Sequence, residues 1–125
     1  MRRVIGVDPG SRKTGYGIIE ISLSKINYVT SGHISVDHEV FPKRLGIIYS
    51  EVLELATSYE VQEMAIEDVF LAKNPNSALK LGQARGVAIA AGIAKDLEIF
   101  EYAARQVKKT IVGKGGASKA QIQHM

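Results

Sequence analysis

Two acidic residues, Asp8 and Glu67, each end a short apolar run that predicts a buried strand. A carboxylate in that position is costly to desolvate unless it is paired or binds a cation. If the first and fourth strands of the fold lie adjacent and parallel, both carboxylates emerge at the same edge of the sheet. Magnesium prefers one or two carboxylates, with water and phosphate oxygens completing its shell. The pair therefore predicts a magnesium site that hydrolyses phosphodiesters, because bound ions can activate water and stabilise the leaving oxygen.

The loop after Asp8 combines glycines, which let a backbone approach phosphate closely, with two cations. Its sequence is Asp8-Pro9-Gly10-Ser11-Arg12-Lys13-Thr14-Gly15-Tyr16-Gly17. For either acidic residue alone, a turn cap or a solvated strand end is the simpler interpretation. The two together beside this loop favour the metal site. Actin-like ATPases and sugar kinases carry a similar Asp-x-Gly loop, so the nucleotide-binding lobe of such an ATPase is an alternative.

Composition indicates a single small domain, which we expect to be cytoplasmic. The 125 residues contain no Cys, which excludes disulfides and thiolate metal sites and suits a reducing compartment. The apolar run at the N-terminus is too short for a signal peptide, and no uncharged stretch is long enough to cross a membrane. All 13 acidic residues precede residue 102, whereas residues 102–125 carry only basic charges. Such a tail favours a polyanionic partner, with a solvated helix face as the alternative.

Three strands must position Asp8 and its loop. Hydrophobic patterning predicts them over Arg2–Asp8 and residues 15–21 and 26–36. The first stops at Pro9-Gly10, because Pro cannot donate to a ladder and Gly frees the backbone to turn. Links short enough for hairpins join the three strands, which predicts an antiparallel meander.

The apolar period then changes to three and four residues, which predicts an amphipathic helix. Its apolar face comprises Leu45, Ile48, Tyr49, Val52, Leu55, Ala56 and Tyr59. A strand over Glu63–Glu67, a helix over residues 77–96 and a strand over Glu98–Tyr102 follow. Asn74 or Asn76 is available as the cap of this second helix.

The last part of the chain predicts a short helix over residues 105–112 and a flexible break over residues 113–116. Ser118-Lys119-Ala120-Gln121 then has the S-x-x-Q pattern of a capping box, which signals the start of another helix. The chain ends at Met125, and so short a helix is marginal by itself. We therefore expect this element to continue beyond Met125.

The order of elements predicts an α/β fold in one domain over residues 1–125. Three meandering strands followed by helix, strand, helix and strand form a mixed five-stranded sheet. In this sheet the first three strands are antiparallel and the fourth and fifth are parallel, with helices on both faces.

Four blocks of sequence resemble the RuvC family of Holliday-junction resolvases. They are Asp8-Pro9-Gly10-Ser11-Arg12 with Thr14-Gly15-Tyr16-Gly17, Ile66-Glu67-Asp68-Val69-Phe70 with Ala72-Lys73-Asn74, Ser77-Ala78-Leu79-Lys80-Leu81-Gly82-Gln83-Ala84-Arg85-Gly86, and Tyr102-Ala103-Ala104-Arg105-Gln106-Val107-Lys108. The resemblance spans essentially the whole chain, and the third block is highly specific. It implies a ribonuclease-H-like fold and a homodimeric endonuclease that nicks two opposed strands of a four-way DNA junction with Mg²⁺ or Mn²⁺. It also implies the branch-migration proteins RuvA and RuvB as partners.

The resemblance assigns Asp8 and Glu67 to two of the family's four metal carboxylates. The other two belong to a helix that would lie beyond Met125. A junction-binding module without activity is therefore a further alternative for this chain. Asp68 follows Glu67 directly, but alternation along a strand should turn it to the opposite face.

Among the basic and aromatic residues, the resemblance assigns five to DNA binding. Phe70 matches an aromatic near the junction's crossover, with a core Phe as the alternative. Lys108 and Lys119 match basic residues near the scissile phosphate, and Arg105 and Lys109 are expected along the DNA path.

Small residues recur along the second helix at Gly82, Gly86 and Ala90. This stripe allows close packing within the monomer, whereas the family uses the region at its dimer interface. The three histidines lack metal-ligand spacing and are expected to be surface or packing residues. They are His33, His38 and His124.

Overall fold

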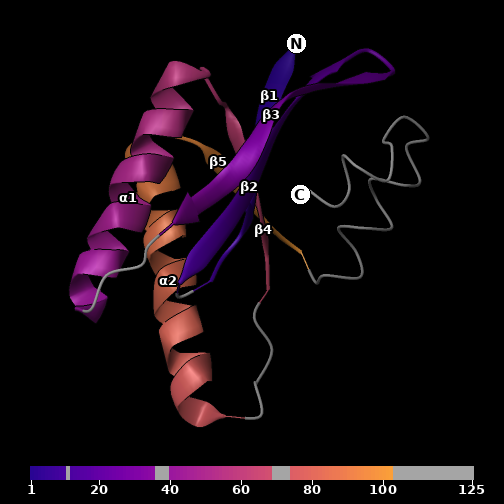
Figure 1. Cartoon of the computed structure of the whole chain (residues 1–125). Coiled ribbons are helices and arrows are strands. Elements are labelled where there is room, and N and C mark those ends of the chain that lie inside the picture. Colours follow the sequence, from indigo (N-terminus) through magenta and orange to yellow (C-terminus); the bar gives the residue numbers. More distant parts are fainter. Residues whose placement is uncertain (11, 36–39, 69–73, 103–125) are drawn as a thin grey trace.

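A mixed five-stranded sheet with two helices forms the part of the chain that the structure describes. The computed structural model describes residues 1–10, 12–35, 40–68 and 74–102. The strand order is β3-β2-β1-β4-β5 (Figure 1). The strands are β1 (Arg2–Asp8), β2 (Lys13–Ser22), β3 (Lys25–Ser35), β4 (Glu63–Glu67) and β5 (Glu98–Tyr102). The predicted sheet is confirmed, with β1 at its centre.

The first three strands form the predicted antiparallel meander. β1 pairs with β2, and β2 pairs with β3, along almost their whole lengths. The link between β2 and β3 consists only of Leu23 and Ser24, and Leu23 has a φ of 51°. A positive φ in a two-residue link suits the right-handed twist of a hairpin. Both strands therefore extend closer to the turn than the hydrophobic pattern predicted.

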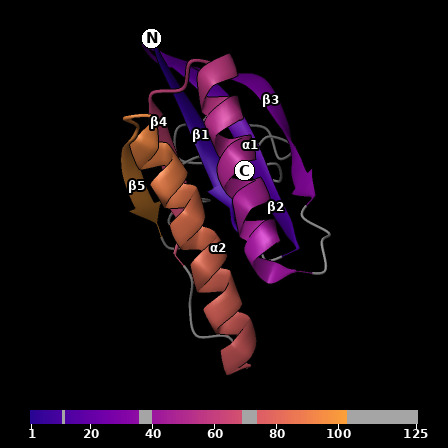
Figure 2. The same ribbon diagram turned by 90° about the vertical axis from the view of Figure 1, so that its left-hand side faces the viewer.

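Both helices of the described chain lie on the same face of the sheet (Figures 1 and 2). They are α1 (Phe41–Ser58) and α2 (Pro75–Ala94). Each has a Pro in its first turn, where the fixed φ of proline suits a helix, and α2 starts earlier than the predicted residue 77. The short helix expected over residues 105–112 lies outside the described residues. The prediction that helices cover both faces of the sheet depends on this segment and therefore stays a prediction.

Alternation of side chains divides the sheet into two faces. Val7 of β1 and Ile66 of β4 are buried in the core beneath the helices. The next residue along each strand points the other way. The core therefore fixes Asp8 and Glu67 on the face opposite α1 and α2.

We expect Asn74→Ala to lower the free energy of unfolding by about 1 kcal/mol. The side chain of Asn74 accepts a hydrogen bond from the backbone N–H of Asn76 at 2.9 Å, at the start of α2. Asn76→Ala is the matched control, because it leaves both the donor and the acceptor in place. Urea denaturation measures the two variants, and equal losses would show that Asn74 is not the stabilising cap.

Candidate metal and nucleic-acid site

Asp8 and Glu67 occupy neighbouring positions at one edge of the sheet. β1 and β4 are parallel, with Val7 beside Ile66 in the register. The next positions are Asp8 and Glu67, so both carboxylates leave the same edge on the same face. This juxtaposition confirms the geometry predicted for the two strands. Asp8 is exposed and Glu67 is partly buried, so solvent reaches the pair through Asp8.

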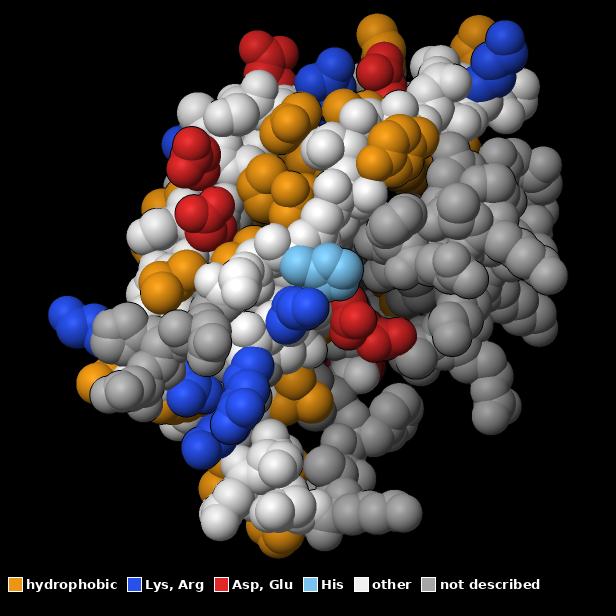
Figure 3. All heavy atoms as spheres, viewed as in Figure 1, with side chains coloured by type: hydrophobic (Ala, Val, Ile, Leu, Met, Phe, Trp, Pro, Cys, Tyr) orange, Lys and Arg blue, Asp and Glu red, His pale blue; other side chains and the backbone are white. Residues whose placement is uncertain are grey.

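β2 and β3 continue this row of residues across the sheet. Asp8 pairs with Gly15, and Gly15 pairs with His33. A Cβ atom at Gly15 would lie 3.7 Å from the Cβ of Asp8 and 3.7 Å from the Cδ2 of His33. Figure 3 shows histidine and acidic side chains gathered side by side on this face of the molecule. Sequence reasoning treated His33 as a surface or packing residue, and the hairpin register is the signal that would have placed it here.

The loop between β1 and β2 is closed by Thr14, which is fully buried. Its hydroxyl donates to the carbonyl oxygen of Gly10 at 3.1 Å and accepts from the N–H of Gly10 at 3.3 Å. A Cβ atom at Gly10 would overlap the carbonyl oxygen of Lys13. The loop therefore needs glycine at this position, and its closure fixes the path of the chain directly after Asp8.

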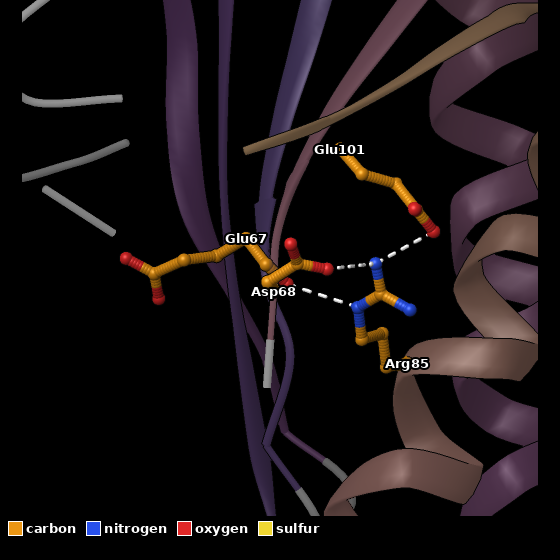
Figure 4. A network of polar contacts seen from close by, with 4 residues as sticks. All are labelled: Glu67, Asp68, Arg85 and Glu101. Atoms are coloured by element: carbon orange, nitrogen blue, oxygen red, sulfur yellow. Dashed lines mark hydrogen bonds and ion pairs between the residues drawn. The ribbon is translucent and has the colours of Figure 1, made fainter. Parts of the chain in front are cut away.

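Arg85 of α2 contacts three acceptors around the end of β4 (Figure 4). Its Nε donates to the carbonyl oxygen of Glu67 at 3.0 Å. Its Nη2 donates to Oδ1 of Asp68 at 3.0 Å and to Oε1 of Glu101 at 2.7 Å. The carboxylate of Asp68 therefore points to the helix side, as predicted, while the side chain of Glu67 points away from Arg85. The carboxylates of Glu67 and Asp68 thus lie on opposite faces of the sheet.

The carboxylates of Asp8 and Glu67 fit half of a site for a hard divalent cation. Within residues 1–10, 12–35, 40–68 and 74–102, no group of three or more His, Cys, Asp or Glu side chains is placed to hold a metal ion. Mg²⁺ commonly takes one or two protein carboxylates and fills its shell with water and phosphate oxygens. Two exposed or partly exposed oxygen donors are compatible with that chemistry.

The residues predicted to contact DNA fall outside the described part of the chain. They are Phe70, Arg105, Lys108, Lys109 and Lys119. The expected break and capping box also lie in residues 103–125, so these interpretations stay predictions.

Among the helices that the structure describes, none is long and apolar enough to cross a membrane.

Comparison with known proteins gives matches along the whole chain. The family model described as crossover junction endodeoxyribonuclease RuvC matches residues 4–125. The RuvC protein of Serratia proteamaculans is 57% identical over 125 residues, which cover 100% of this chain and 72% of that relative. The RuvC protein of Dichelobacter nodosus is 54% identical over 123 residues, covering 98% of this chain and 70% of that relative.

Solved structures share the arrangement of the sheet and helices. Thermus thermophilus RuvC in complex with a Holliday junction substrate matches with a TM-score of 0.82 at 26% identity, covering 98% of this chain and 75% of that chain. The yeast mitochondrial Holliday junction resolvase matches with a TM-score of 0.60 at 11% identity, covering 90% and 58%, and supports the fold alone. The ribonuclease-H-like architecture expected from the sequence is confirmed.

Proposed function

Because the chain belongs to the RuvC family of crossover junction endodeoxyribonucleases, we propose that it nicks two opposed strands of a four-way DNA junction at a divalent-metal site that includes Asp8 and Glu67. Such nicking resolves junctions in recombination and repair. The observation that carries the metal site is the parallel register of β1 and β4, which brings the two carboxylates together on one face. The family match favours this function over the ATPase lobe.

In this proposal Asp8 and Glu67 hold Mg²⁺, or Mn²⁺, which accepts similar oxygen donors. A bound cation supplies a more acidic water and neutralises charge that develops on the phosphate. The chain itself contributes two carboxylates fixed at adjacent register positions. Two negative charges at this edge of the sheet would favour a cation there, and the exposed position of Asp8 lets a phosphate approach.

Phosphate contacts are proposed to supply most of the affinity for the junction. Arg12 and Lys13 are exposed beside the loop that follows Asp8, and Lys108 and Lys119 belong to the acid-free tail. Each phosphate that a basic side chain neutralises releases counterions, so the affinity should fall steeply as salt rises. Such contacts position the junction and leave the recognition of its shape to other residues.

We expect Phe70→Ala to weaken junction binding by about 2 kcal/mol, which is close to thirtyfold in Kd. Phe70 follows Glu67 closely along the chain, so an aromatic ring there can stack on an unpaired base at the crossover. Mobility-shift titrations with a four-way junction and with a linear duplex measure the effect. The loss should be confined to the junction, and an equal loss on the duplex would contradict the stacking role.

The outer side of α2 supports the proposed homodimer. Apart from the neighbouring residues and backbone of α2 itself, no atom of the described residues lies within 4 Å of a Cβ built at Gly82 or Gly86. Leu79 and Ile93, which are 68% and 59% exposed, share this side of the helix at spacings of three and four residues. A two-fold contact through the stripe of Gly82, Gly86 and Ala90 would be self-complementary and would place two active sites, one for each of two opposed DNA strands.

Partnership with RuvA and RuvB and a cytoplasmic location stay predictions.

A second candidate function is junction binding without cleavage. It is favoured by the finding that no third potential ligand joins the two carboxylates among the residues that the structure describes. Nicking and mobility-shift assays on residues 1–125, and on a version extended through the helix expected beyond Met125, separate the two functions. Mg²⁺-dependent nicking by the extended version supports the nuclease, and nicking in excess chelator contradicts its metal site. Robust nicking by residues 1–125 would exclude the inactive binding module.

A further inference from the structure

We propose that Arg85 is a positioning residue for Glu67, and that it holds the end of β4 so that the Glu67 carboxylate faces Asp8. This inference rests on the proposed metal site. It assigns a role to a side chain of α2, on the other side of the sheet from the carboxylate that it positions (Figure 4).

The end of β4 needs support from outside the ladder. β4 is five residues long, and Glu67 is the last of them. Its partner in the register is Tyr102, the last residue of β5, and the N–H of Asp68 donates to the carbonyl oxygen of Tyr102 at 2.6 Å. Strand ends open more readily than strand centres, because fewer hydrogen bonds hold them. A metal ligand at such an end therefore depends on additional contacts.

Arg85 supplies a contact to the backbone of the proposed ligand itself. The guanidinium is a rigid planar fork that can satisfy several acceptors at once, and this side chain is only 17% exposed. Its partners Asp68 and Glu101 are 48% and 52% exposed, and ion pairs at such exposure stabilise a fold weakly. These pairs instead orient the guanidinium, and its bond to the carbonyl oxygen of Glu67 adds to the ladder contacts that hold the strand end.

The contacts of Arg85 also help to keep the carboxylates of Glu67 and Asp68 on opposite faces of the sheet. Arg85 holds Asp68 on the helix side, so Asp68 does not compete with Glu67 for the cation. Because the carbonyl of Glu67 is held from that side as well, its side chain is directed to the opposite face (Figure 4). Loosening Arg85 should therefore disturb the geometry of the cation site beyond any effect on stability.

The test compares Arg85→Lys with Arg3→Lys in residues 1–125. Arg3 is a matched control, because its Nη1 donates to the backbone carbonyl of Tyr59 at 2.7 Å and its Nε lies 3.6 Å from Oε2 of Glu20. Arg3 belongs to the end of β1 that is remote from Asp8. Titration calorimetry with Mn²⁺ gives the Kd of each variant, and urea denaturation gives its stability. Arg85→Lys should weaken Mn²⁺ binding roughly tenfold, whereas Arg3→Lys should leave the affinity unchanged.

The outcomes separate this inference from the proposed function. If the parent chain does not bind Mn²⁺, the metal site itself is contradicted. If the parent binds and Arg85→Lys binds equally well, the positioning role is overturned. Should Arg85→Lys fail to fold, Glu101→Gln loosens the same guanidinium more gently. A smaller loss of Mn²⁺ affinity in that variant supports the inference, and an unchanged affinity overturns it.

Discussion

Replacing Asp8 by Asn should lower metal-dependent nicking of a four-way junction on the order of a thousandfold. Asn keeps the shape of the side chain but removes the charge that attracts the cation. Because Asp8 is exposed, the substitution should leave the packing of the sheet intact. Junction binding should persist, since its phosphate contacts come from basic side chains. Single-turnover nicking by a version extended through the helix expected beyond Met125, at saturating Mg²⁺, measures the effect.

Asp96→Asn is the control for this change of charge. Asp96 is exposed between α2 and β5, with a φ of 59°, a conformation that Asn adopts readily. It precedes β5, whereas the proposed site lies at the other end of the strands. Nicking by Asp96→Asn should match the parent. If Asp8→Asn nicks at the parent's rate, Asp8 is not a metal ligand.

Replacing Gly10 by Ala should lower the free energy of unfolding by about 3 kcal/mol. The added Cβ would overlap the carbonyl oxygen of Lys13, which is a backbone atom that cannot rotate away. The loop must therefore shift, and the two hydrogen bonds between Thr14 and Gly10 are strained with it. Since this loop follows Asp8 directly, nicking by molecules that still fold should fall as well. Urea denaturation and the nicking assay measure the two effects.

Gly46→Ala is the matched control for Gly10→Ala. Gly46 lies on the exposed side of α1, and apart from the neighbouring residues and backbone of this helix no described atom is within 4 Å of a Cβ built there. Ala has a higher helix propensity than Gly by about 1 kcal/mol, so this variant should be more stable than the parent. The same substitution should thus have opposite signs at the two positions. A Gly10→Ala variant as stable as the parent would show that the loop does not need glycine.

The paired position of Asp8 and Glu67 was predictable from the sequence because it depends on link lengths and alternation. Hairpin links make the first three strands antiparallel, and helical crossovers make β4 and β5 parallel to the strands beside them. Apolar residues such as Val7 and Ile66 then fix which face each carboxylate occupies. The same alternation correctly predicted that the side chain of Asp68 points to the face opposite Glu67, which is the helix side.

Contacts that depend on docking were not predictable from local pattern. Arg85 lies 18 residues from Glu67 in the sequence, and they meet only because α2 packs over β4 and β5. His33 reaches the row of Asp8 through the register of two successive hairpin pairs, which no apolar period encodes. The start of α2 was predicted in part: Asn74 is confirmed as its cap, but the helix begins at Pro75 and not at residue 77, because the cap and the proline set the first turn more than buried residues do.

Paramagnetic broadening by Mn²⁺ in isotope-labelled residues 1–125 tests most directly whether Asp8 and Glu67 form one cation site. We predict that the amide signals of Asp8, Gly15 and Glu67 broaden together at low Mn²⁺, since the three residues occupy neighbouring positions on three strands. Excess Mg²⁺ should restore them, and Asp8→Asn should suppress the broadening at Glu67 as well. Broadening centred elsewhere in the sheet, or broadening at Glu67 that survives Asp8→Asn, would contradict a shared site.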